Sequence, residues 1–483
     1  MGKESQVKIG LRAFLGAAII LLCLMIVSGI LTKVLPAGSY EREIENGRTL
    51  IVPGSFEFET NPEYPFWRWI TAPLEVVFAS DNLALITIII FLLFVGGSIA
   101  ILEHAEVMSF LIAKLVGKFK KRKYLLMKII IFMFMFLASF LGIYEGMVPL
   151  IIFIVPLAHS LGWDSLTGLG LSLLPMAFGF ASSVTNPFTI GVAQKIADLP
   201  LFSGAWLRVL FFIIVYLSVY FFVSRYAKKI EKDPEESLVH AEEESRMNLD
   251  QGDEMKDYSS TKKGMHRAVL WFSVCMGFAI TMVLLASVVP AMSDLAFPLM
   301  GLFFFIGGIG GGLLAGLSKK EVAASFFKGW GNMAPGVLLI LMAYSVKYIV
   351  DQGGITDTIL YYAASSIQGA PVLSAAFLIY LLTLAMNFFI GSASAKAFLM
   401  MPILTPLADL VGITRQTAVL AFGFGDGFSN MLFPSNALLL IALSFTVVSY
   451  PKWIRWTIPL QILMAVLSCL FIVFAVLIGY GPF

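Results

Sequence analysis

The chain has little charge and few of the residues that carry chemistry. Only 13% of its 483 residues are charged, and it has three cysteines and four histidines. A soluble domain is usually about one quarter charged, so this composition excludes an ordinary set of two or three soluble domains. Cys23, Cys275 and Cys469 stand alone in apolar runs. This favours buried or lipid-facing thiols over a disulfide or a metal site.

The motifs of common catalytic sites are also missing. The sequence contains no G-x4-G-K-[ST] phosphate loop, no G-x-S-x-G nucleophile motif and no spaced cluster of histidine and cysteine. These absences argue against an ATP-driven pump and against a membrane-embedded enzyme. We therefore expect no catalytic residues, no nucleic-acid partner and no cofactor, apart from a sodium ion or a proton as a coupling ion.

Long apolar segments dominate what is present, since 59% of the residues are hydrophobic. Segments of about 20 apolar residues are long enough to cross a bilayer, so the fold class is all-α polytopic membrane protein. We predict nine crossings. Seven are continuous, at 12–35, 82–102, 205–227, 268–290, 297–317, 333–350 and 456–480, and two are broken helices, at 165–200 and 415–450.

Two further apolar regions, 125–163 and 371–411, carry small or charged residues at their midpoints, and we predict that both are re-entrant hairpins. The excess of Lys and Arg at Lys118–Lys123 and Arg225–Lys229 predicts that these loops and the N-terminus are cytoplasmic. The amphipathic segments 104–118 and 355–367 are expected to lie along the interface.

An acidic segment, 230–263, separates a first half (1–229) from a second half (264–483). Its Ser/Glu-rich composition predicts a disordered cytoplasmic linker. The outside loop, 36–81, is the largest loop on the opposite face, and its part 36–66 is expected to form a small hairpin.

The two halves share a repeat. AFGFASSVTN begins at Ala177, and AFGFGDGFSN begins 244 positions later at Ala421. Upstream, PLAHSLG at Pro156 matches PLADLVG at Pro406, and the order of the elements is the same in both halves. A duplicated unit follows. Because the predicted crossings place the two units in opposite orientations, we expect an inverted repeat, which is typical of secondary transporters.

Each repeat interrupts an apolar helix with small and polar residues. A break exposes backbone N–H and C=O groups to a ligand, whereas an intact helix satisfies its own. Gly425 and Gly427 are expected to permit the unwound backbone, and Pro187 and Pro434 to end the helical ladder. The two breaks therefore predict a binding site near the middle of the membrane.

Three charged residues lie within the predicted membrane. Glu145 is at the tip of the first hairpin, Lys396 is at the tip of the second, and Asp426 is in the second break. A charge at this depth costs about 2.5–3.5 kcal/mol, so it usually has a use or a partner. Both signs suit an amino acid, which carries a carboxylate and an ammonium. The alternative is that Lys396 forms a purely structural pair with Glu145 or with Asp426.

The candidate substrate-binding residues come from both tips and both breaks. They are Tyr144, Glu145, Ser183, Thr185, Asn186, Asn387, Ser392, Ser394, Lys396, Asp426, Ser429 and Asn430.

Four stretches carry a resemblance to a known family. The chain resembles the YfcC-like branch of the C4-dicarboxylate anaerobic carrier family, which includes proteins assigned as basic amino-acid and arginine/ornithine antiporters. The resemblance covers nearly the whole chain and implies a homodimer in which a scaffold domain holds an elevator-type transport domain. The stretches are LPAGSYER, GIYEGMVPLIIFIVPLA, SSVTNPFTIGVAQKIADLPLFSG and GSASAKAFLMMPILTPLADLVGITRQTAVLAFGFGDGFSN.

The resemblance also bears on coupling. In relatives by fold, sodium lies between hairpin tips and broken helices, and the Lys396 ammonium could replace one such ion. We therefore expect sodium-independent exchange, or at most one sodium site near Ser183, Thr185 and Asn186.

The sequence thus predicts a secondary active transporter of the plasma membrane. The favoured substrate is a basic amino acid, moved by exchange or by ion-coupled transport, and a dicarboxylate or other carboxylate is the alternative. A channel or a membrane-embedded enzyme fits less well, because paired broken helices in inverted units suit alternating access.

Overall fold

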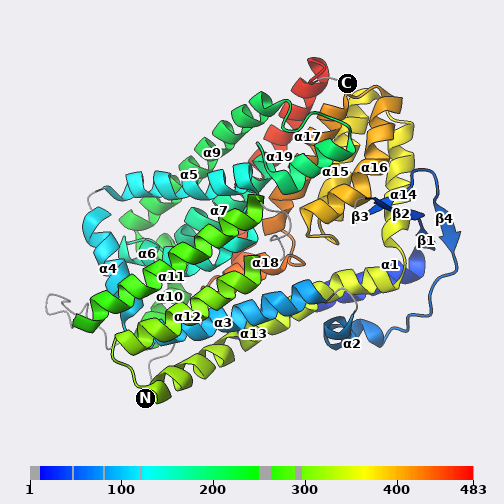
Figure 1. The fold of residues 1–483 in the computed structure, drawn as a ribbon. Coiled ribbons are helices and arrows are strands. Elements are labelled where there is room, and N and C mark those ends of the chain that lie inside the picture. The colour runs from blue at the N-terminus through cyan, green and yellow to red at the C-terminus, as the bar shows by residue number, and fades with distance from the viewer. Residues whose placement is uncertain are drawn as a thin grey trace.

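The computed structural model describes residues 11–45, 48–79, 82–119, 122–249, 263–288 and 296–481, and the described chain is mostly helical (Figure 1). The helices are α1 (Leu11–Val34), α2 (Arg68–Glu75), α3 (Leu83–His104), α4 (Val107–Phe119), α5 (Lys123–Leu141), α6 (Ile151–Ser160), α7 (Ser165–Ser182), α8 (Val192–Ile196), α9 (Ala205–Lys232), α10 (His240–Leu249), α11 (Lys263–Val288), α12 (Ala296–Leu314), α13 (Lys319–Gln352), α14 (Thr356–Gln368), α15 (Val372–Met386), α16 (Ala393–Val411), α17 (Arg415–Gly427), α18 (Ala437–Ser444) and α19 (Tyr450–Leu477).

Five long helices pack side by side in one layer, in the order α11, α12, α3, α13, α1, and we call this layer the helix row (Figure 1). Small residues let its backbones approach closely. A Cβ added to Gly329 of α13 would collide with the backbone of Gly96 and Gly97 in α3, and one added to Gly308 of α12 would meet Ser98. These contacts explain why the row is rich in glycine.

The helices α5–α9 and α15–α19, which include the short helices α6, α8 and α18, form a second body around α7 and α17, and we call it the bundle. Every residue of α7 is buried, and so is almost every residue of α17. The short helix α4 joins the row to the first half of the bundle, and α14 joins it to the second half. The two interrupted helices therefore lie at the centre of the bundle.

Nine helices among the described residues are long and apolar enough to cross a membrane, which confirms the predicted number. Two members of the set differ from the prediction. Lys123–Leu141 and Ala393–Val411, each an arm of a predicted hairpin, qualify, whereas the apolar part of α12, Pro298–Leu314, and the whole of α17 are too short. The re-entrant hairpins stay a prediction.

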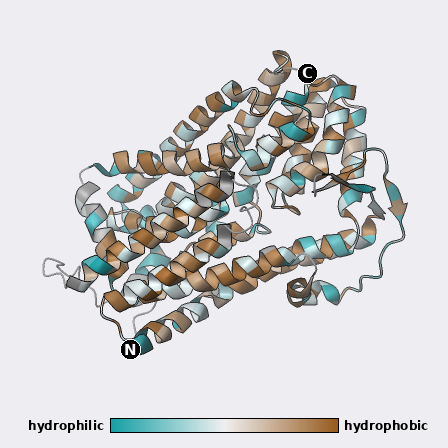
Figure 2. Ribbon diagram, viewed as in Figure 1, coloured by the Kyte–Doolittle hydropathy of each residue, from teal (hydrophilic) through white to brown (hydrophobic). Residues whose placement is uncertain are grey.

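Large apolar side chains are exposed along α1, α9, α11 and α19, for example Ile19, Phe221, Leu270 and Ile462, each at least 61% exposed. A soluble protein rarely exposes apolar patches of this size to water, so these faces are suited to contact with lipid. Figure 2 shows the hydrophobic colour along most of the helices, with the hydrophilic colour gathered at helix ends and in the outer loop.

The predicted hairpin in 36–66 is confirmed as two antiparallel strand pairs. Strand β1 (Ala37–Ser39) pairs with β4 (Glu57–Glu59), and β2 (Arg42–Glu45) pairs with β3 (Arg48–Ile51). A bidentate ion pair of Arg42 with the buried Asp357, at 2.8 and 3.0 Å, attaches these strands to α14. The outer loop is thus fixed to the helix that joins the row to the bundle.

The prediction of a disordered linker is wrong for Ile230–Leu249. This part contains the last turn of α9, the short helix Pro234–Glu236 and α10. Charged and polar groups of the segment bond to the bundle, and Val239 is fully buried. Composition alone misses this docking because the partners come from elsewhere in the chain. The rest of the linker, 250–262, and the basic N-terminus lie outside the described residues.

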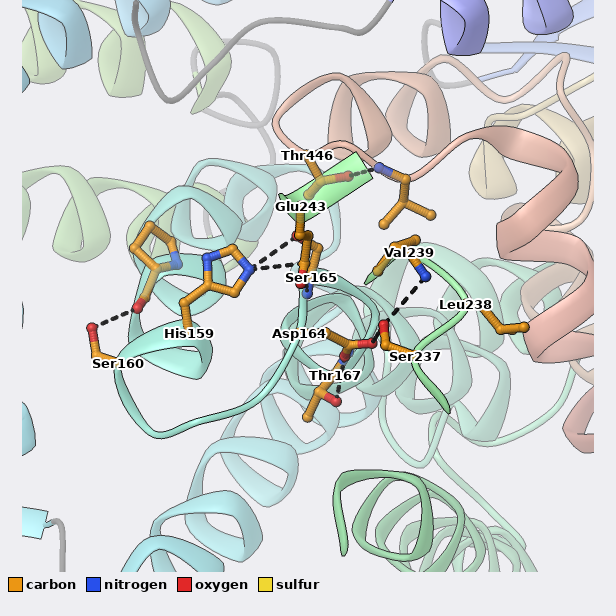
Figure 3. Close-up of polar contacts among 12 residues, drawn as sticks. His159, Ser160, Asp164, Ser165, Thr167, Ser237, Leu238, Val239, Glu243 and Thr446 are labelled. Atoms are coloured by element: carbon orange, nitrogen blue, oxygen red, sulfur yellow. Dashed lines mark hydrogen bonds and ion pairs between the residues drawn. The ribbon is translucent and has the colours of Figure 1, made fainter. Parts of the chain in front are cut away.

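Three of the contacts that hold the segment in place come from α10. Glu243 accepts hydrogen bonds from the Ser165 backbone, at 2.7 Å, and from His159, at 3.1 Å. Glu242 pairs with Lys452 at 2.5 Å. Figure 3 shows His159 and Glu243 pointing toward each other beside Ser165, with Asp164 and Ser237 nearby. We call the contacts of Glu242 with Lys452 and of Glu243 with His159 and Ser165 the α10 clamp.

Candidate functional site

The first break, Ser183–Asn186, is held against the end of α5. Ser183 takes a left-handed conformation with φ of 39°, which ends α7. The Val184 N–H donates to the Ser139 hydroxyl at 3.1 Å, and the Thr185 hydroxyl donates to the Phe140 carbonyl at 2.9 Å. The unwound backbone is thus satisfied by the residues that precede the first tip, Gly142–Leu150.

Asn186 connects the first break to the next turn of helix. Its side-chain oxygen accepts hydrogen bonds from the N–H groups of Phe188, at 2.9 Å, and Thr189, at 3.3 Å. The Asn186 side-chain nitrogen is buried and has no partner among the described residues. Gly142 in the first tip has φ of 68°, and a Cβ there would collide with Asn186. Only glycine therefore fits this contact without strain.

The second break, Phe428–Asn436, is stabilised by three asparagines. Asn387, which ends α15, donates to the Ser429 hydroxyl at 2.7 Å and to the Asn430 side-chain oxygen at 2.9 Å. Asn436 donates to the same Asn430 oxygen at 3.0 Å. Four predicted site residues, Asn387, Ser429, Asn430 and Lys396, are therefore brought together, because Asn387 also accepts a hydrogen bond from the Lys396 ammonium.

Lys396 and Asp426 form an ion pair in the interior of the bundle. Their charged atoms are 2.5 Å apart, and their side chains are 0% and 1% exposed. The Asp426 carboxylate accepts no hydrogen bond from the described residues beyond this contact. Removing one member of such a pair would leave an uncompensated buried charge. The pair is electrically neutral as a unit.

The expected role of Gly425 and Gly427 is wrong. Both residues and Asp426 lie in the last turn of α17, which continues as a 3-10 helix over Phe428–Met431, so the non-helical part is 432–436. A Cβ at Gly427 would collide with Ala181 of α7, and one at Gly425 would collide with Thr383 and the Tyr380 carbonyl of α15. These glycines allow three helices to approach closely, so they serve packing and not unwinding.

Glu145, at the first tip, contrasts with the pair. Its side chain is accessible to solvent although its carboxyl group lies deep within the fold, and no basic side chain of the described residues forms an ion pair with it. It is close enough to Asp426 and to Tyr344 of α13 to interact with both electrostatically. The neighbouring Tyr144 is buried, and its hydroxyl has no partner in the described part of the chain. Glu145 is thus a free carboxylate beside a neutralised pair.

Ser392 and Ser394 lie at the second tip, away from these contacts. Ser392 is exposed and caps α16 by accepting a hydrogen bond from the Ala395 N–H at 3.4 Å. Its hydroxyl is 3.5 Å from that of Ser394. Among the described residues, the Ser392 and Ser394 side chains form no hydrogen bond with the Lys396 ammonium or the Asp426 carboxylate, although the Lys396 N–H donates to the Ser392 carbonyl at 3.0 Å.

The sodium site expected near Ser183, Thr185 and Asn186 stays a prediction. The Ser183 and Thr185 hydroxyls donate to the carbonyls of Phe180 and Phe140, which leaves the lone pairs of both hydroxyl oxygens free, whereas the Asn186 side-chain oxygen already accepts hydrogen bonds from two N–H groups. Hard cations need several oxygen ligands with free lone pairs. The described residues also contain no group of three or more acidic, histidine or cysteine side chains that could hold a metal ion.

Sequence reasoning missed the polar contacts that join the outer ends of the two interrupted helices. Gln416 at the start of α17 is fully buried and lies 3.2 Å from Gln194 of α8 and 3.0 Å from the Ser203 hydroxyl. It also missed Arg208, a fully buried arginine in the first turn of α9. A lone arginine in an apolar run was the signal that could have identified it.

Comparison with known proteins follows the whole length of the chain. A family model described as DcuC, C4-dicarboxylate anaerobic carrier, matches residues 16–477. An Escherichia coli (strain K12) protein named "Putative basic amino acid antiporter YfcC" is 30% identical over 490 residues, which cover 96% of each chain. An uncharacterized protein of Haemophilus influenzae Rd is 26% identical and covers 81% of this chain and 75% of its own length.

Two solved structures are also similar. The YdaH transporter of Alcanivorax borkumensis is 17% identical, with a TM-score of 0.39, and the match covers 97% of this chain and 99% of that one. MtrF of Neisseria gonorrhoeae is 16% identical, with a TM-score of 0.40, and the match covers 95% and 94%.

Proposed function

Since the chain belongs to the C4-dicarboxylate anaerobic carrier family, we propose that it is a secondary active transporter that exchanges basic amino acids. Membership of this family makes the chain a multi-pass membrane transporter and not an enzyme. The substrate and the exchange mode are our proposal.

The observation that carries the proposal is which of the three charged residues, Glu145, Lys396 and Asp426, are paired with one another. Lys396 and Asp426 neutralise each other at 2.5 Å, whereas Glu145 is exposed and has no basic partner in the described part of the chain. A free carboxylate attracts a cation, and hydrogen bonds to a charged group are the strong ones. The guanidinium or ammonium of a basic amino acid supplies such a partner for Glu145.

A dicarboxylate is the alternative, and the name of the family favours it. Its two carboxylates would need cationic or amide donors. The candidate site contains one lysine, whose ammonium is already engaged by Asp426 and Asn387. A dicarboxylate would therefore have to displace Asp426 from a buried pair, which is costly.

Three further features of the transporter follow the same proposal. The Lys396 ammonium replaces a coupling cation, so exchange is independent of sodium. The bundle is the moving transport domain of an elevator and the helix row is the scaffold, with α4 and α14 as the connections. The protein is a homodimer of the bacterial inner membrane, with hairpins and broken helices in inverted repeats. The separation of row and bundle supports this arrangement.

Counterflow in proteoliposomes tests the proposal. Vesicles are loaded with unlabelled ornithine or arginine, and uptake of labelled arginine is measured with and without external sodium. Rapid, saturable, sodium-independent uptake is expected. If arginine is not exchanged but succinate is exchanged in vesicles loaded with succinate, the dicarboxylate function replaces ours. Unitary currents without saturation would instead identify a channel.

A further inference from the structure

Arg208 of α9 is fully buried and bonds to the first break. Its Nε–H donates to the Val184 carbonyl at 3.1 Å. Its two terminal nitrogens donate to the carbonyls of Ser203, at 3.0 Å, and Phe202, at 3.2 Å. One guanidinium thus connects the middle of the first interrupted helix to the loop beyond its outer end.

The partners of this guanidinium are neutral. Besides the three carbonyls, Arg208 donates to the Tyr480 hydroxyl at 3.3 Å, and none of the described carboxylates forms an ion pair with it. Burying an unpaired charge is costly, so it is retained only where oriented dipoles offset the cost or where the charge has a use. Four hydrogen bonds to oxygen atoms supply such an offset.

The second half treats the equivalent carbonyl in a similar way. Phe428 follows Val184 by 244 positions, the spacing of the repeat, and its carbonyl accepts a hydrogen bond from Gln461 of α19 at 3.4 Å. Trp453 of α19 donates to the Met431 carbonyl at 2.9 Å. In both halves, therefore, the long helix that follows the break supplies side-chain N–H groups to its carbonyls.

The need for these donors is physical. A helix break leaves carbonyls without their helical N–H partners, and in a membrane protein water cannot replace those partners cheaply. Such a carbonyl has to be held by another part of the protein if the unwound conformation is to persist. Arg208 does this for Val184, whereas Phe428 lies in a 3-10 helical turn and Gln461 adds a hydrogen bond to its carbonyl.

We propose that Arg208 is a positioning residue for the substrate site, because it fixes the unwound backbone of the first break and links it to the loop 197–204 between α8 and α9. Phe202 in that loop has φ of 59°, a strained conformation for a bulky residue, and its carbonyl is one of those that Arg208 holds. A planar guanidinium can reach three carbonyls at once, whereas the glutamine of the second half reaches one. The site residues affected are Ser183, Thr185 and Asn186.

Hydrogen–deuterium exchange of the purified full-length protein tests the backbone part of this proposal without any substrate. The variants are Arg208→Lys and Arg208→Gln, with Arg415→Gln as the matched control, because Arg415 bonds to Asp409 and to the Ala197 carbonyl. Loss of the hydrogen bonds from the Arg208 guanidinium should speed amide exchange in residues 183–191 by about tenfold or more, while amide exchange in residues 425–432 should be unchanged.

Transport kinetics test the functional part, which rests on the proposed exchange of basic amino acids. In the counterflow assay, both Arg208 variants should raise the KM for arginine by about tenfold or more, because the first break would hold Ser183, Thr185 and Asn186 less well in place for the substrate. Arg415→Gln should leave KM unchanged. Arg208→Lys, which keeps the charge, should be the milder variant.

The outcomes separate the two proposals. Absence of arginine exchange in the wild type contradicts the proposed substrate, whereas the exchange experiment still decides the role of Arg208. If a folded Arg208 variant shows unchanged exchange in 183–191, or equal acceleration in 183–191 and 425–432, Arg208 is not a positioning residue. Tyr480→Phe removes one of the four bonds of Arg208, together with the hydrogen bond from the Tyr480 hydroxyl to the Gly204 carbonyl, and provides this measurement if both Arg208 variants fail to fold.

Discussion

The two repeats place similar breaks at the centre of the bundle, but they treat charge in opposite ways. The first break contains no charged residue, its carbonyl is held by a buried arginine, and the adjacent tip carries the free Glu145. The second break lies beside the neutral Lys396–Asp426 pair, and its carbonyls are held by Gln461 and Trp453. The repeated sequence interrupts a helix in both halves, while the backbone conformation and the charges differ.

From this difference we expect the charged residues of the second half to contribute to stability and those of the first half to contribute to ligand binding. A neutral pair buried on both sides contributes mainly to the structure, because each member depends on the other for its charge. A carboxylate that is exposed and unpaired is free to bind a ligand. We therefore expect changes in the second half to act first on stability and changes in the first half to act first on transport.

The largest effect is expected when the pair is broken. Lys396→Met leaves the Asp426 carboxylate buried without a counterion or a hydrogen-bond donor. Loss of about 3–5 kcal/mol of stability should follow. The measurement is the temperature at which detergent-solubilised protein loses its monodisperse peak in size exclusion.

The double variant Lys396→Met with Asp426→Asn is the control, because it removes both charges. It should recover most of the lost stability. Equal destabilisation by the single and the double variant would show that the ion pair is not what stabilises this region, and the comparison of the two halves would then fail.

Glu145→Gln should have the next largest effect, on transport and not on folding. No counterion is left behind, so the melting temperature should change little, whereas kcat/KM for arginine exchange should fall by about 100-fold through loss of a charge-assisted contact. Glu41→Gln, at an exposed position between β1 and β2, is the matched control. Normal exchange by Glu145→Gln would remove the basis of the proposed substrate.

Glycine-to-alanine substitutions at the two tips should differ. Gly142→Ala introduces a Cβ at φ of 68°, in collision with Asn186, and should cost about 1–2 kcal/mol. Gly391→Ala at the second tip meets no atom within 4 Å and has no positive φ, so it should be neutral. Thermal stability and exchange rates of both variants check this, and equal effects would contradict the asymmetry of the tips.

The smallest effect is expected at the α10 clamp. Burial alone would raise the pKa of Glu243, but hydrogen bonds from His159 and Ser165 outweigh it, so this pKa lies below its usual value. Stability from this carboxylate is therefore complete above about pH 4.3, the usual glutamate pKa, and is lost as the pH falls through the lowered value.

Glu243→Gln should reproduce that loss at neutral pH, at about 1 kcal/mol, because the contact is partly exposed. Limited proteolysis of 230–249 measures the release of the clamp, and Glu244→Gln, on the exposed neighbour, is the control. Release that grows as the pH rises from 5 to 7 would contradict the assignment to Glu243.

Much of the fold could be predicted from the sequence, because membrane helices are specified by local composition. The predicted helix 205–227 is present as Ala205–Lys232, and 268–290 is present as Lys263–Val288. Even the interruptions of 165–200 and 415–450 were visible, since glycine, proline and small polar residues cannot continue an apolar helix without a reason. The residues of the tips and breaks could be identified because they are polar or small and interrupt apolar helices.

The errors concern tertiary contacts. Gly425 and Gly427 suggest an unwound backbone, yet they lie in α17 because the backbones of Ala181 and Tyr380 pass close to them. The acidic linker looked disordered because the partners of Glu242 and Glu243 come from α6, α7 and α19. Which of Glu145 and Asp426 would pair with Lys396 also depends on packing and could not be read from spacing.

The contact of Gly427 with Ala181 has a consequence for biogenesis. It joins α17 to α7 so closely that neither helix is fully buried without the other. Yet α7 is synthesised long before α17, so the first half enters the membrane with its central helix still lacking its partner. We expect assembly to end with the insertion of the second repeat against the first, and a chain truncated before Arg415 to be recognised by quality control as unfinished.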